Sequence, residues 1–156
     1  MIGNNVPSGD FTSRMNYTLL ETIGIIEGIA SAQPNINTIV KSGDIYDLNT
    51  DHWNKQYAAF CVTQTNHSIN EDFINYRFTL FYVDRLVLDK SNTIEIQSTA
   101  VQVFDNIIKR LKLDMNANIN AGEVHPFTSR FAAECAGAYM NCDITVAKAT
   151  NCGVLY

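Results

Sequence analysis

The sequence predicts an α+β domain in which an antiparallel β-sheet is flanked by two main helices. Two segments, one near the N-terminus and one past the middle, place apolar residues at helical spacing. The other ordered segments alternate apolar and polar residues, as half-buried strands do. Several strands follow one another directly, which argues against a doubly wound parallel fold. The expected order of elements is α-β-β-β-α-β-β.

Length and composition indicate one globular domain. The chain has 156 residues, of which 46% are hydrophobic and 17% charged, and this balance excludes intrinsic disorder. We expect residues 1–156 to form a single domain with a flexible arm at 1–12, a core at 13–148 and a tail at 149–156. The longest apolar run is too short to cross a membrane and the N-terminus lacks secretory features, so the cytoplasm is expected.

The net charge of −5, from 16 acidic and 11 basic residues, bears on possible partners. The bases are scattered, whereas a protein that wraps nucleic acid needs a basic stripe.

The first helix is expected to begin after an N-cap at Thr12 or Ser13 and to end before Pro34. Gly24 and Gly28 weaken it by about 1 kcal/mol each relative to alanine. They predict close packing of this helix on the sheet. The expected buried stripe consists of Met15, Leu19, Ile23, Ile26 and Ala30.

Strands are expected at 36–48, as one strand or a pair around 42–44, and then at 57–69 and 73–88. The last of these has the clearest alternation. One face carries Ile74, Tyr76, Phe78, Leu80 and Tyr82, and the other carries Asn75, Arg77 and Thr79.

The second helix is expected to begin after 89–92, where Asn92 and Glu95 resemble a capping box. A polar connector at 114–122 should follow, and then strands at 124–131 and 140–146. Pro126 predicts that the first of these lies at the edge of the sheet. The expected helical stripe is Ile94, Val101, Phe104, Ile108 and Leu111.

No residue pattern points to catalysis, a cofactor or a metal. The histidines are far apart in sequence and belong to no catalytic motif, namely His52, His67 and His125. The cysteines fit no zinc template and are interpreted as buried apolar residues, with a disulfide or metal role as the alternative: Cys61, Cys135, Cys142 and Cys152. Asp84 and Asp89 are interpreted as turn and cap residues rather than as an acid–base or metal pair.

Trp53, Asn75, Arg77 and Thr79 are the candidate subunit interface. A tryptophan in a polar turn is typical of an interface anchor, although it could equally fold over the sheet edge. The polar face of the 73–88 strand is either solvated or a subunit contact. Amide and hydroxyl groups can hydrogen-bond between protomers at a lower desolvation cost than charged groups.

The chain resembles a family of small tailed-bacteriophage proteins, the tail-terminator or neck (head–tail connector) proteins, particularly those of crAss-like phages. The resemblance spans residues 13–148. It is carried by the first helix, by Pro34-Asn35-Ile36-Asn37-Thr38-Ile39-Val40 with Ser42-Gly43-Asp44, by Tyr82-Val83-Asp84-Arg85-Leu86, and by Asp89-Lys90-Ser91-Asn92 before the second helix.

This resemblance implies a non-enzymatic structural protein of the virion neck or tail, assembled in the host bacterial cytoplasm. It implies a closed ring of 12 or 6 copies, with portal or other neck ring proteins and tail proteins as partners. Genomic DNA would pass through the channel, and no cofactor or membrane would be involved. The alternatives are a small non-virion phage protein with a binding or regulatory role and a small hydrolase whose His/Cys or His/Asp site is assembled by the fold.

Overall fold

The computed structural model describes residues 17–41, 57–128 and 135–148. Within these ranges the chain forms two helices and one six-stranded sheet, so the expected α+β class is confirmed. The predictions for the arm, the tail and the turn at 42–44 fall outside the described residues. So do those for His52, Trp53 and Cys152.

The strands of the sheet lie in the spatial order β2 (Thr38–Val40), β3 (Ala59–Gln64), β5 (Phe73–Arg85), β7 (Cys135–Ala147) and β6 (Asn118–Thr128). β4 (Ser68–Ile69) pairs with the beginning of β5, so the predicted strand at 57–69 is two separate strands. All neighbours are antiparallel except β2 and β3, which makes the sheet mixed rather than wholly antiparallel.

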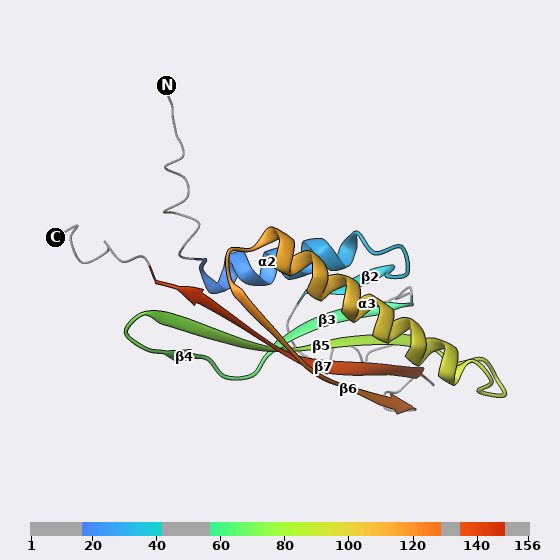
Figure 1. The fold of residues 1–156 in the computed structure, drawn as a ribbon. Coiled ribbons are helices and arrows are strands. Elements are labelled where there is room, and N and C mark those ends of the chain that lie inside the picture. The colour runs from blue at the N-terminus through green and yellow to red at the C-terminus, as the bar shows by residue number, and fades with distance from the viewer. Residues whose placement is uncertain (1–16, 42–56, 129–134, 149–156) are drawn as a thin grey trace, which may run out of the picture.

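Both helices lie side by side on one face of the sheet (Figure 1). α2 (Leu19–Ser31) and α3 (Thr93–Asp114) run in opposite directions across it. The even-numbered residues of β5 face these helices, as the alternation predicted. The largest fully buried side chains between the two layers include Phe60, Phe78, Tyr82, Phe104, Ile26 and Leu80.

α2 begins at a capping box. The backbone N–H of Glu21 donates to Thr18 Oγ1 over 3.1 Å, and the N–H of Thr18 donates to Glu21 Oε1 over 2.9 Å. Thr18, and not Thr12 or Ser13, is therefore the N-cap. The prediction that Gly24 and Gly28 allow close packing is wrong, since a Cβ at either position would meet nothing within 4 Å.

α3 begins without the predicted capping box, because the Asn92 side chain is used elsewhere. Its Oδ1 accepts the N–H of Val87 over 3.0 Å, and its amide donates to the Arg85 carbonyl over 3.2 Å. Asn92 thus holds the turn after β5. Ile94 and Val101 are 74% and 46% exposed, so the predicted stripe was partly out of phase. The helix buries Ile96, Ala100, Val103, Phe104, Ile107, Ile108 and Leu111.

The C-terminal strands are longer than predicted. β6 begins at Asn118, inside the expected connector, because pairing with β7 overrides the weak strand propensity of this asparagine-rich segment. The edge position of β6 is confirmed. β7 begins at Cys135 rather than Met140, and Gly137 permits its close approach to β5. A Cβ at Gly137 would collide with the Tyr82 carbonyl oxygen and lie 2.9 Å from Val83 Cα.

Candidate subunit interface

Asn75, Arg77 and Thr79 lie on the face of β5 that points away from both helices, as the alternation predicted. We call this side the outer face of the sheet. It carries the odd-numbered residues of β5 and their cross-strand neighbours on β3 and β7. Trp53, the fourth candidate, falls outside the described residues.

The three candidate residues form a polar ladder with β7. The pairs are directly opposite in register: Asn75–Thr145, Arg77–Asp143 and Thr79–Asn141. Thr79 Oγ1 donates to Asn141 Oδ1 over 2.8 Å, and Thr145 Oγ1 donates to Asn75 Oδ1 over 3.3 Å. Between them, Arg77 Nε lies 3.9 Å from Asp143 Oδ2. Cross-strand pairs of this kind stabilise a sheet by roughly 0.2–1 kcal/mol each.

The polar ladder is satisfied within the monomer and leaves two amide donors without a partner among the described residues. The side chains of Arg77 and Asp143 are each 39% exposed, so solvent screens their attraction. The side-chain amides of Asn75 and Asn141 accept through oxygen in the ladder, and their nitrogens donate to none of the described residues. Both amide donors therefore remain available to water or to another chain.

The other end of the outer face is apolar. Ala59, Cys61, Phe81, Val83 and Cys135 form a second buried cluster, separate from the core under the helices. The rings of Phe81 and Tyr139 lie 5.6 Å apart, and His125 stacks on Tyr139 with a centroid distance of 4.9 Å. The outer face thus changes from apolar to polar along β5 and β7.

His67 has a structural role. The N–H of Arg77 donates to its Nδ1 over 3.1 Å, and its Nε2 lies 3.0 Å from Gln64 Oε1. Its ring also meets the edges of Tyr76 and Phe78. His67 therefore holds the connection between β3 and β4 against β5.

Three cysteines are buried, as predicted, and are not in disulfides: Cys61, Cys135 and Cys142. Burial, with a smaller contribution from Asp143, raises the pKa of the Cys142 thiol to about 12. This thiol stays protonated at neutral pH and is a poor nucleophile. Among the described residues, no group of three or more His, Cys, Asp or Glu side chains is placed to hold a metal ion.

Asp89 is a turn residue, as predicted, since its Oδ1 accepts the N–H of Ser91 over 3.1 Å. Asp84 differs, because burial raises the pKa of its carboxyl group, against the opposing effect of a hydrogen bond from the N–H of Arg85. It lines a polar pocket of about 390 Å³ at the amino end of α3, together with Tyr82 and Glu95. No local sequence pattern predicted this pocket. The sequence held one clue to it. Asp84 is an even-numbered residue of β5, so its carboxylate lies on the side of the strand that faces the helices.

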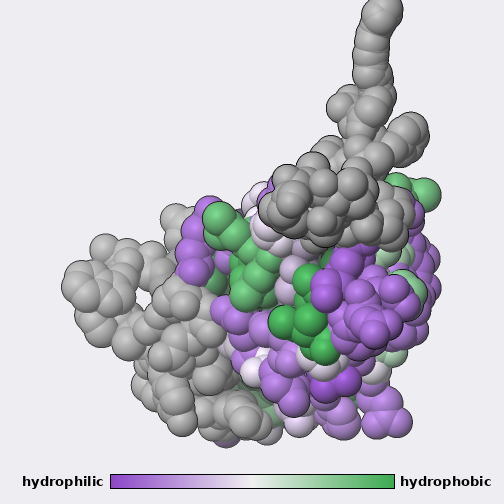
Figure 2. Space-filling model, turned by 90° about the vertical axis from the view of Figure 1, so that its left-hand side faces the viewer, coloured by the Kyte–Doolittle hydropathy of each residue, from purple (hydrophilic) through white to green (hydrophobic). Residues whose placement is uncertain are grey.

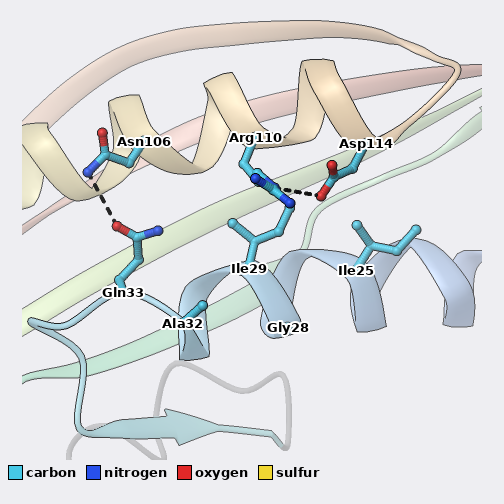
Figure 3. Close-up of a pocket in the computed structure, with 8 residues that line it drawn as sticks. All are labelled: Ile25, Gly28, Ile29, Ala32, Gln33, Asn106, Arg110 and Asp114. Carbon is cyan, nitrogen blue, oxygen red and sulfur yellow. Dashed lines mark hydrogen bonds and ion pairs between the residues drawn. The ribbon is translucent and has the colours of Figure 1, made fainter.

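A second hollow, an open groove of about 620 Å³, lies between α2 and α3 (Figure 3). α2 contributes mainly apolar lining, with Ile25 and Ile29 above Gly28, and α3 contributes polar side chains. Arg110 points from α3 toward Ile29 and pairs with Asp114, Nε to Oδ2, over 2.9 Å. That pair lies within α3, and the hydrogen bond across the groove runs from the Asn106 amide on α3 to Gln33 Oε1, just after α2, over 3.3 Å.

The sequence matches no family model, and no curated protein is significantly similar to it. Neither helix in the described part of the chain is long and apolar enough to cross a membrane.

Proposed function

We propose that this protein is a structural subunit of a bacteriophage neck or tail, where copies of it form a closed ring that joins the portal or connector to the tail. The observation that carries the proposal is the polar ladder on the outer face. It lies on the two long central strands, which have 13 residues each, and neither of the two helices in the described ranges lies on that face. A face of this kind is suited to contact with other protein subunits.

Two further observations support assembly rather than a monomeric role. Large apolar side chains are exposed at both ends of α3, including Leu88 at 102% and Leu113 at 79%. The net charge of −5 would allow the subunit to line a DNA channel without binding the duplex tightly. We propose no catalytic residue, cofactor or metal for this role.

The test is imaging and mass measurement of the full chain, alone and mixed with the portal and tail proteins encoded beside it. Negative-stain microscopy and mass photometry should give rings of 12 or 6 copies that bind the portal. The protein should also be present in purified virions in the same copy number. A chain that is absent from virions and binds neither portal nor tail protein would refute the role and favour a non-virion binding protein.

A further inference from the structure

The polar pocket at the amino end of α3 is acidic. Its lining includes the carboxylates of Asp84 and Glu95 and no lysine or arginine. The volume of about 390 Å³ is large enough to receive a long side chain. We call it the acidic pocket.

Three side chains that line the acidic pocket can accept a donor from another molecule, whereas Asn37 and Asn92 are hydrogen-bonded within the chain. Tyr82 is only 2% exposed, and its hydroxyl makes no hydrogen bond to a described residue. Asp84 accepts one backbone hydrogen bond and, like Glu95, forms no ion pair with the described residues. The half-buried Asp84 carboxylate accepts a single backbone hydrogen bond, so burial of its charge costs free energy that a further donor would offset. A cationic donor such as a lysine ammonium could pair with this carboxylate and also donate to the Tyr82 hydroxyl oxygen.

Exposed apolar side chains lie beside the acidic pocket. Ile94 precedes Glu95 on the first turn of α3 and is 74% exposed. Leu88, in the turn that leads to α3, is 102% exposed. An anionic pocket flanked by apolar side chains has the composition of a protein contact, in which desolvated apolar area surrounds a specific polar anchor.

The carboxyl end of α3 carries the complementary groups. Lys109 and Arg110 are neutralised by ion pairs with Asp105 and Asp114, over 2.8 and 2.9 Å. Lys112, in the last turn, is exposed and forms no ion pair with the described residues.

Apolar side chains are also exposed at this end. Leu113 is 79% exposed, and Leu20 is 82% exposed at the start of α2, which lies near the end of α3 (Figure 1). Figure 2 views this end of the molecule and shows hydrophobic patches beside hydrophilic surface.

We propose that copies of this chain associate head to tail, with Lys112 of one copy inserted into the acidic pocket of the next. Leu113 and Leu20 then pack against Leu88 and Ile94 of the neighbour. The two surfaces are separated by the length of α3, about 33 Å for 22 residues. A contact between different ends of the same subunit is heterologous, so repetition closes into a ring or extends as a filament. This inference rests on the proposed function and identifies the two surfaces that would meet between neighbouring subunits of the ring.

The test is a charge exchange, read by sedimentation of the purified full chain over a range of concentrations. Glu95→Lys and Lys112→Glu should each weaken self-association on the order of tenfold or more, because like charges then meet at the contact. The double variant should associate again. Glu123→Lys, which reverses an exposed carboxylate on β6, is the matched control and should associate like the wild type.

Tyr82→Phe is the second variant, because it removes only the hydroxyl and keeps the buried ring. It should keep the stability of the monomer and weaken association several-fold. If the Glu95→Lys and Lys112→Glu single variants each still assemble into normal rings, this contact is wrong and the proposed function is unaffected. A wild-type chain that stays monomeric at every concentration would also overturn it. Absence from virions would instead count against the function, whatever the chain does in solution.

Discussion

The hydroxyl of Tyr76 on β5 donates a buried hydrogen bond of 2.8 Å to the backbone carbonyl of Tyr17, just before α2. These residues are 59 positions apart in the sequence. The bond attaches the amino end of α2 to the central strand, beneath the helical layer. Tyr17 Oη in turn accepts the N–H of Asn116 after α3, over 3.4 Å. The amino end of α2 and the carboxyl end of α3 are therefore both joined through Tyr17, which is bonded to the central strand β5.

Tyr76→Phe should destabilise the protein by about 1–3 kcal/mol, because the Tyr17 carbonyl loses its buried donor. Urea unfolding followed by circular dichroism measures the change. Tyr82→Phe is the matched control, since that hydroxyl bonds to no described residue, and its free energy of unfolding should stay close to wild type. Equal losses in the two variants would show that the Tyr76–Tyr17 bond contributes nothing specific.

Gly137→Ala should destabilise the sheet by about 3 kcal/mol or more, since the new Cβ collides with the backbone of β5 at Tyr82 and Val83. The strands must separate, because neither contacting group is a flexible side chain. Thermal unfolding and hydrogen exchange at β5 and β7 measure the effect. A variant with unchanged stability would contradict the close approach of the two strands.

Gly24→Ala should have the opposite effect and stabilise the protein by about 1 kcal/mol. The position is helical, and a Cβ there meets nothing within 4 Å, so alanine removes the conformational cost of glycine. The urea midpoint should rise without a change in slope. A loss of stability would indicate that a neighbouring group occupies this space.

Asp84→Asn should stabilise the protein at neutral pH and have no effect well below pH 3.8. The folded pKa of Asp84 lies above its ordinary value of 3.8, mainly because burial disfavours the charged form. Stability is therefore lost as the pH rises through 3.8 toward the folded pKa, and asparagine removes that loss. Melting temperatures of the two proteins across this pH range measure it.

Asp89→Asn is the control of opposite sign. Hydrogen bonds from Ser91 lower the folded pKa of Asp89, so its charged form stabilises the turn above that pKa. The variant should be less stable than wild type at neutral pH. Shifts of the same sign in both variants would contradict the difference in environment between the two carboxylates.

Arg77→Glu should leave the monomer folded and impair assembly, if the polar ladder is part of a subunit contact as proposed. The substitution places two carboxylates in register across β5 and β7, which costs about 0.2–1 kcal/mol. Arg77→Glu combined with Asp143→Arg restores the pair in the opposite order and separates stability from assembly. Normal particles from both variants would remove this face from the interface.

Local patterns were enough to predict the fold class and much of β5. Period-two alternation placed Asn75, Arg77 and Thr79 on one face correctly, because side-chain direction in a strand depends only on parity. The start of α2 was misplaced because several hydroxyl residues precede it, and only Thr18 has a glutamate three residues later. The early start of β6 was missed because its pairing with β7 is a tertiary effect.

The partners of the candidate residues could not be predicted from the sequence. The ladder requires the register of β5 against β7, which no local pattern encodes. The acidic pocket draws on residues near 35, 57, 84 and 95, so its composition exists only in the folded chain. Asp84 was interpreted as a turn or cap residue, whereas it lies within β5 and lines this pocket.

The central position of β7 has a consequence for synthesis on the ribosome. Until residues 135–147 have emerged, β5 has an open edge on the side where β7 will pair, and β6 has no partner among the other described strands. The nascent chain must hold its completed helices and early strands with that edge unprotected, a state that favours aggregation. Truncation before β7 should therefore yield insoluble protein rather than a smaller stable domain.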